Sequence, residues 1–235
     1  MPRVQDLVQL AFTPNQAKHI CDSNGGWYQP FYSVDGNYSD DTWVYASSIT
    51  VTVPTSALTR YEKGMKVRLK QGGGYKYYYI TIVTATVITL NGGSDYTVAN
   101  AAITDLEVSS AESPFGFPDF FNWTTTLSGG GSPAMIISAP VISFSKFSIK
   151  GKTVLIYVMF TCTTADTANS DLRFTLPTTN TTNNAGGACR IGNTSGGLFG
   201  SWLLSNGLCI VRISGDGNWG LGTLRTVVLT GFYEF

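Results

Sequence analysis

The chain has 235 residues, of which 43% are hydrophobic and 13% aromatic, and this content excludes an intrinsically disordered protein. Its 15 basic and 15 acidic residues cancel to a formal net charge of zero, which excludes a global field that attracts nucleic acid or an anionic membrane. Charged residues form only 13% of the chain, about half the usual share, so other polar residues must build most of the surface. Such a surface favours a chain that packs against copies of itself.

No apolar run approaches the roughly 18 residues that span a bilayer, and no apolar stretch follows a basic start. We therefore expect no membrane insertion, and a chain that is kept in a cytosol or in a particle assembled there. The cysteines show no close pair spacing, which predicts free thiols at Cys21, Cys162, Cys189 and Cys209. The sequence predicts neither a metal site nor a cofactor.

Residues 1–45 are predicted to form an N-terminal arm with a short helix and an aromatic connection. Apolar side chains recur at the spacing of one helix face: Val4, Leu7, Val8 and Ala11. Residues 13–16 have the pattern of a second helix start, with a Thr cap, a Pro at the first helical position and a closing Gln. A short helix is marginal alone in water, so it packs either on a docking partner or on the chain's own domain.

Residues 46–123 are predicted to form a small domain of antiparallel strands. Two kinds of side chain alternate in residues 65–70, apolar Met65, Val67 and Leu69 with basic Lys66, Arg68 and Lys70. This period is typical of a strand with one face buried and one face in water. The glycines at 72–74 and the pair Asn91-Gly92 predict chain reversals, because these residues tolerate positive φ.

A fixed order of features runs through residues 61–123. A Tyr-x-Lys-Gly element is followed by the basic alternating strand, a Gly-rich turn, an aromatic strand, a Gly-Gly-x-x-Tyr turn and a Pro-x-Gly-Phe-Pro exit at residues 114–118. This order resembles a small β domain of tail, baseplate and tail-fibre proteins of double-stranded DNA bacteriophages. The resemblance implies a part of a virion, and it supplies no active site.

The C-terminal part is predicted to be a β-sandwich head of jelly-roll type over residues 135–235, joined by a Gly-rich linker at 124–134. The run at residues 153–162 is apolar on both faces, which predicts a central strand buried between two layers. Further strands about ten residues apart, separated by turn signals, are typical of a sandwich. The whole chain is therefore predicted to be mainly β.

Three segments of this head carry a second resemblance: residues 149–154 with a Lys-Gly-Lys turn, the Phe-Thr-Leu-Pro element at 174–177, and the closing strand at 231–235. They resemble the C-terminal head domains of phage tail fibres and receptor-binding proteins. The resemblance implies a homotrimer that binds the host surface through its head. The N-terminal arm would then dock on other virion proteins.

Catalytic chemistry finds little support in the sequence, and no enzyme is predicted. His19 is the single histidine, so a catalytic triad would depend on one residue of the N-terminal arm. The glycines in residues 215–220 match a dinucleotide-binding pattern, but a strand follows them where a helix is required. Paired carboxylates for polysaccharide cleavage would have to come from predicted loops, which hold Asp166, Asp171 and Asp216.

Basic and aromatic residues interleave in residues 61–79, a composition that also suits a platform for single-stranded nucleic acid. The alternative is a solvated strand face together with aromatic packing between subunits. The zero net charge favours this alternative, so no nucleic-acid partner is expected.

Sugar recognition requires aromatic ring faces beside amide and carboxylate groups. The candidate receptor-binding residues are Trp202, Asp216, Asn218 and Trp219. Trp202 can equally be a core residue, whereas Trp219 lies among turn residues and is harder to bury.

The sequence therefore predicts a bacteriophage virion protein, a trimeric tail fibre or receptor-binding protein that attaches the particle to a host-surface glycan. A head-fibre, capsid-decorating or baseplate spacer protein without a receptor role is the alternative. A polysaccharide depolymerase is the third hypothesis.

Overall fold

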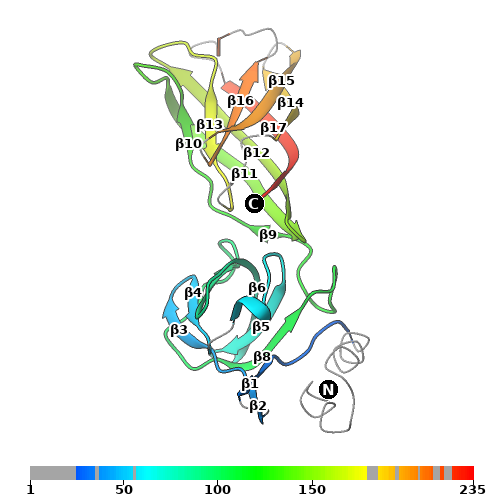
Figure 1. Ribbon diagram of the computed structural model, residues 1–235. Helices are drawn as coiled ribbons and strands as arrows, with labels where there is room; N and C mark the ends of the chain where they lie inside the picture. Colours follow the sequence, from blue (N-terminus) through cyan, green and yellow to red (C-terminus); the bar gives the residue numbers. More distant parts are fainter. Residues whose placement is uncertain are drawn as a thin grey trace. The chain divides into compact units, whose positions relative to one another are not determined.

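A computed structural model of the chain describes residues 25–34, 37–54, 57–178, 185–193, 196–205, 207–213, 218–219 and 224–235 (Figure 1). Strands in antiparallel sheets make up 60% of these residues, with one 3-10 turn, η1 (Ala57–Thr59), so the prediction of a mainly β fold is confirmed. The predicted N-terminal helix, His19 and Cys21 lie outside the described residues. No helix in the described part of the chain has the length and hydropathy that a membrane crossing needs.

The chain folds as two compact units, residues 1–119 and residues 120–235. We call them unit 1 and unit 2 and describe each by itself. The predicted boundaries were 46 and 123 for the small β domain. Unit 1 also takes in part of the predicted arm, because Trp27 and Trp43 are buried in it.

Unit 1 contains a hairpin, β1 (Phe31–Val34) with β2 (Asn37–Asp40), and a six-stranded antiparallel sheet in the order β3-β4-β7-β6-β5-β8 (Figure 1). The strands of this sheet are β3 (Val44–Ser47), β4 (Thr50–Thr52), β5 (Lys66–Gln71), β6 (Gly74–Val83), β7 (Val87–Asn91) and β8 (Thr104–Ser109). A turn at the predicted glycines 72 and 73 connects β5 to β6, and these two strands pair as neighbours. A second turn, with Gly93 at positive φ, follows β7, and the chain then returns to pair β8 with β5.

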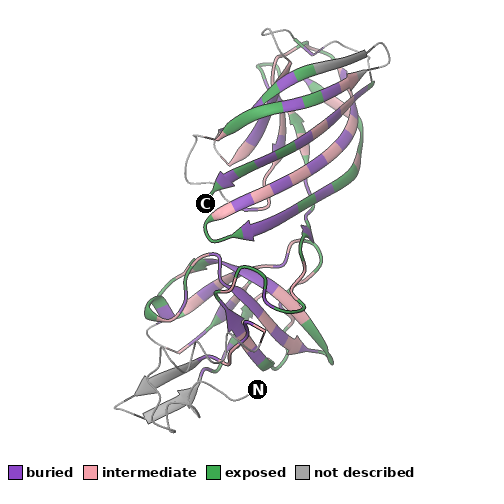
Figure 2. Cartoon of the chain, turned by 90° about the vertical axis from the view of Figure 1, so that its right-hand side faces the viewer, coloured by how far each residue is buried: buried purple, intermediate pink, exposed green. Residues whose placement is uncertain are grey.

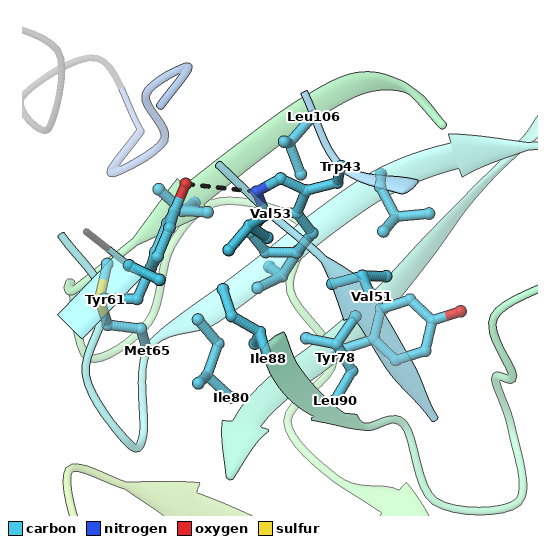
Figure 3. Close-up of a cluster of buried hydrophobic side chains, with 14 of the residues drawn as sticks. Trp43, Val51, Val53, Tyr61, Met65, Tyr78, Ile80, Ile88, Leu90 and Leu106 are labelled. Atoms are coloured by element: carbon cyan, nitrogen blue, oxygen red, sulfur yellow. Dashed lines mark hydrogen bonds between the residues drawn. The ribbon is translucent and has the colours of Figure 1, made fainter. Parts of the chain in front are cut away.

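One face of this sheet covers the apolar core of unit 1 (Figure 3). Val67 and Leu69 of β5 are fully buried in it, as their alternation predicts. Trp43 and Tyr61 meet edge to face with ring centroids 5.5 Å apart, and the Trp43 indole N–H donates to the Tyr61 hydroxyl over 3.3 Å. The sequence pattern thus locates this face correctly.

The opposite face of β5 was predicted to lie in water, and for its first residue this is wrong. Lys66 is only 3% exposed, and its amine lies 5.9 Å from the centre of the Tyr79 ring and 6.0 Å from that of Phe117. Two segments of the chain cover this face, since Phe117 lies beside Lys66 and the Trp27 ring lies 4.7 Å from the Arg68 guanidinium. The segments are joined to each other, because the Trp27 indole donates to the carbonyl of Phe115 and Phe115 N–H to that of Gly25. The Pro-x-Gly-Phe-Pro exit is therefore a cover for the sheet.

Unit 2 is one continuous antiparallel sheet of nine strands, in the order β10-β13-β16-β15-β14-β17-β12-β11-β9, which curls around its own core (Figure 1). Its strands are β9 (Phe121–Asn122), β10 (Leu127–Gly129), β11 (Ile136–Lys150), β12 (Thr153–Ala165), β13 (Leu172–Thr175), β14 (Gly186–Asn193), β15 (Gly196–Ser205), β16 (Leu208–Ile213) and β17 (Leu224–Glu234). The stretch predicted as a linker contributes β10, which pairs with β13.

The strand β12 has two different faces (Figure 2). Every second residue is fully buried in the core, and the buried apolar set is Val154, Ile156, Val158, Phe160 and Cys162. The residues between them, Leu155, Tyr157 and Met159 included, are only partly buried. The expectation that this strand is buried on both faces therefore does not hold within a single chain.

Candidate binding site

The structure describes three of the four predicted receptor-binding residues. Asp216 lies outside the described residues, and Asn218 is exposed. Trp219, which was expected to be hard to bury, is 0% exposed. Its burial has a clear cause, because its backbone N–H donates to the Asn169 carbonyl over 2.9 Å and its indole N–H to the Ser170 carbonyl over 3.0 Å.

Trp202 of β15 is also buried, at 4% exposure. A Cβ atom built on Gly187 would lie 2.8 Å from the indole nitrogen, and one on Gly231 would lie 2.5 Å from the ring. The backbone therefore approaches the ring closely at two glycines, as expected for a core residue. Neither tryptophan has an open ring face for a sugar, although Asn218 remains available beside Trp219.

Trp219 is instead hydrogen-bonded to a loop at residues 169–171, which lies just before β13. This loop is held by local hydrogen bonds, since the Asp171 N–H donates to the Asn169 side-chain oxygen over 2.9 Å and the Ser170 hydroxyl contacts Asp171 Oδ1 at 3.1 Å. Gly130 N–H donates to the Asp171 carbonyl over 2.8 Å. Five hydrogen bonds, two within the loop, two from Trp219 and one from Gly130, thus fix its conformation.

The consecutive glycines that follow β10 allow this close contact. A Cβ atom on Gly130 would lie 2.7 Å from the Asp171 Cβ and 3.0 Å from Arg173 Nη2. Gly131 has a φ of +99°, and a Cβ there would lie 2.4 Å from the Asn169 side-chain nitrogen. These glycines were predicted to belong to a linker, but they let the β10 loop pack against residues 169–173.

Two arginines meet at Asp171, and we call Asp171, Arg173 and Arg212 the Asp171 cluster. Arg212 Nε donates to Oδ1 over 2.7 Å, and Arg173 Nη2 contacts Oδ2 at 3.4 Å. The side chains of Arg173 and Arg212 are 34% and 39% exposed. The hydrogen bond from Arg212 is the main reason why the pKa of Asp171 lies below its ordinary value, so this carboxylate stays ionised.

The Asp171 cluster can bind but is poorly suited to proton transfer. Both guanidinium groups are partly exposed, and Arg173 Nε is buried without a hydrogen-bond partner. Guanidinium groups present paired N–H donors that suit carboxylates and hydroxyl groups. Asp171, named in the sequence analysis as a potential catalytic acid, is already bound by both arginines and would be a poor general acid.

Sequence reasoning missed the two arginines of the cluster. Both occur as single charges within otherwise apolar strands, in the runs Leu-Arg-Phe at 172–174 and Val-Arg-Ile at 211–213. An isolated charge between inward-facing apolar residues must point outward. That signal, in a chain with so few charges, could have identified them.

The basic and aromatic residues of unit 1 do not form an open platform. Tyr61, Tyr78 and Tyr79 are at most 2% exposed, and burial raises the pKa of Tyr78. Arg68 forms an ion pair with Glu107 and lies 4.7 Å from the Trp27 ring centre. Most of these side chains are engaged within unit 1, which favours the packing interpretation over nucleic-acid binding.

The cysteines that the structure describes are free and buried, in agreement with the sequence prediction: Cys162, Cys189 and Cys209. Burial raises the pKa of Cys162 and of Cys189 to about 11, so both thiols are protonated near neutral pH. Within the described ranges, no three His, Cys, Asp or Glu side chains are grouped to hold a metal ion.

Comparison of the chain with protein-family models, with curated proteins and with solved structures found no match.

Proposed function

We propose that the chain is a bacteriophage virion structural protein, a homotrimeric tail fibre or receptor-binding protein, whose unit 2 is a jelly-roll-like head that attaches the particle to a host-surface glycan. The two resemblances in the sequence support a virion part, and the two β units are compatible with them. The observation that carries attachment is the Asp171 cluster, a half-exposed pair of arginines held rigidly in a chain with few charges.

The cluster favours a particular kind of glycan. Its partly exposed guanidinium groups suit a sugar that carries a carboxylate or phosphate group. Asn218, exposed next to Trp219, adds an amide for hydroxyl groups. Contacts of this kind are weak for one head, and several heads that engage together would make attachment firm.

A spacer function is the second candidate, as a head fibre, capsid-decorating protein or baseplate component. The burial of Trp202 and Trp219 favours it, because the aromatic platforms expected for sugar binding are core residues. A depolymerase has less support, since Asp171 is held as an ionised partner of two arginines.

Binding of the labelled full chain to candidate host cells and to their isolated envelope glycans tests this proposal. Loss of a charge-assisted hydrogen bond costs about 1.5–3 kcal/mol, so Arg173→Gln and Arg212→Gln should each weaken binding roughly 10- to 100-fold. Lys152→Gln, in the exposed turn between β11 and β12, is the matched control and should bind like the wild type. Wild-type protein that binds no cell or glycan would favour the spacer, and release of reducing sugar would indicate a depolymerase.

A further inference from the structure

The outward side of unit 2 has an unusual composition. We define the outer face as the side chains of β11, β12, β17, β14 and β15 that point away from the core. These strands are adjacent in the sheet, and in β12 and β17 the residues alternate between buried and more exposed positions (Figure 2). The outer face is therefore continuous across five strands.

Strand register places one apolar row across the middle of this face. Phe144 pairs with Met159, Met159 with Val228, Val228 with Arg190, and Arg190 with Phe199. Residues that pair across neighbouring strands lie on the same side of the sheet with Cβ atoms about 5 Å apart. Four of the five side chains in this row are apolar, and Phe199 is 77% exposed.

Other apolar residues surround this row. The exposed apolar residues of the outer face are Ile136 at 52%, Val141 at 58%, Phe144 at 37%, Phe199 at 77%, Leu224 at 50% and Phe232 at 67%. Leu155, Tyr157, Met159 and Val228 are partly buried. Soluble monomers rarely expose a continuous apolar patch of more than a few hundred Å². A face of this kind is expected to be covered.

The size of the outer face suits a protein interface. Strands lie about 4.8 Å apart and rise about 3.3 Å per residue, so five strands and the residues from Leu155 to Thr163 span roughly 19 Å by 26 Å. The projected area is roughly 500 Å², and side-chain relief adds accessible surface to it. This is of the same order as the ~800 Å² that each partner contributes to a standard interface.

We infer that the outer face packs against further copies of this chain. The inference rests on the self-association in the proposed function, and it names the surface responsible. The face carries both signs of charge, with Lys146 and Arg190 against Glu234, so copies can be complementary to one another. Within the described part of the chain, neither Arg190 nor Glu234 forms an ion pair.

The border of the face also fits an interface between proteins. Arg212 of the Asp171 cluster pairs in register with Ser201 of β15, so charged and hydroxyl groups lie next to the apolar row. An apolar centre with a polar rim is the usual arrangement of such interfaces. A glycan would need polar partners at the centre, where the structure has Met159 and Val228.

Light scattering of the full chain at micromolar concentration tests the inference. The wild type should have at least twice the 25.3 kDa mass of one chain, whereas Met159→Glu and Val228→Glu should fall to the mass of one chain. Ile82→Glu replaces a 46% exposed apolar residue of unit 1 and is the matched control, which should keep the wild-type mass. Met159→Leu should keep it as well.

The outcomes separate the two proposals. If Met159→Glu and Val228→Glu keep the wild-type mass and a wild-type circular dichroism spectrum, the outer face is not the interface, and self-association through another surface stands. If the wild type itself has the mass of one chain, both the interface and the proposed self-association are wrong. Amide hydrogen exchange in β12 and β17 distinguishes a folded monomer from an unfolded variant.

Discussion

The two units treat the second face of a central strand differently. In unit 1, the chain's own residues cover the second face of β5, where Phe117 and Trp27 lie over Lys66 and Arg68. In unit 2, the second face of β12 stays half-exposed, with Met159 at its centre. The comparison shows that unit 1 supplies its own cover, whereas in unit 2 the face is the one that we infer to pack against further copies of the chain.

One acidic residue in each unit forms ion pairs, and the two residues differ in how far they and their partners are buried. The Asp41 side chain is 0% exposed and binds both Arg60 and Tyr61, so it holds segments of unit 1 together. Asp171 binds two arginines that remain accessible. A buried ion pair is costly to break, while a half-exposed one remains in contact with solvent.

The largest expected effect is on Asp41. Asp41→Ala leaves Arg60 and the Tyr61 hydroxyl without their buried acceptor, and removal of one partner of a buried pair costs about 3–5 kcal/mol. Asp171→Ala, the matched change in unit 2, should cost less than about 1 kcal/mol because its partners are half-exposed. Chemical unfolding monitored in each unit measures both. Equal losses would remove the distinction between a structural and an accessible ion pair.

A smaller effect is expected for the cover of unit 1. Phe117→Ala removes ring contacts with Tyr79 at 5.0 Å and with Trp27 at 6.0 Å, and it uncovers Lys66. We expect a loss of about 2–3 kcal/mol, below the usual range for a fully buried Phe because this ring is only partly buried. Phe115→Ala is the control from the same motif, since Phe115 is 81% exposed, and it should change stability by less than about 0.5 kcal/mol.

Gly130→Ala tests whether the close packing of the β10 loop against residues 169–173 is required. The added methyl group would meet Asp171 and Arg173, and we expect a loss of about 1–2 kcal/mol together with weaker glycan binding. Gly74→Ala is the control, because nothing lies within 4 Å of its Cβ position and its backbone is not in the left-handed region. Thermal unfolding and binding of the two variants provide the measurement. An unchanged Gly130→Ala protein would show that the close contact is not required.

The smallest expected effect is the change of folding stability with pH, and this change has opposite signs for Asp41 in unit 1 and Asp171 in unit 2. Burial is the main cause that raises the pKa of Asp41, so the stability from this group is complete below 3.8 and declines as the pH rises through the folded pKa. The pKa of Asp171 is lowered, so its contribution is present above 3.8 and is lost as the pH falls through its folded pKa.

Urea unfolding between about pH 3 and pH 7 measures both changes in stability, and the change from Asp171 should be about 1 kcal/mol or less because its partners are half-exposed. Asp41→Asn should remove the decline toward higher pH, and Asp171→Asn the decline toward lower pH. The same slope in both variants and in the wild type would show that neither carboxylate is responsible.

The sequence predicts strand positions well where apolar and polar residues alternate, as in β5, and where a long apolar run occurs, as in β12. It also shows that residues 153–162 are apolar on both sides, but it contains no signal for whether the cover comes from the same chain or from another. The Asp171 cluster joins residues about 40 positions apart with a glycine loop, and such contacts depend on strand order. The turn residues next to Trp219 in sequence predicted that it is hard to bury. Its burial depends instead on hydrogen bonds to Asn169 and Ser170, which are about 50 positions away in the chain.

Peroxide oxidation of the native full-length protein, followed by mass spectrometry of each methionine, tests most directly whether the outer face is covered. Met65 and Met135 are buried within the chain at 8% and 2% exposure and serve as slow references. We predict that Met159 is oxidised as slowly as they are in the wild type, and much faster in Val228→Glu. Rapid oxidation of Met159 in the wild type would show an open face and contradict the account.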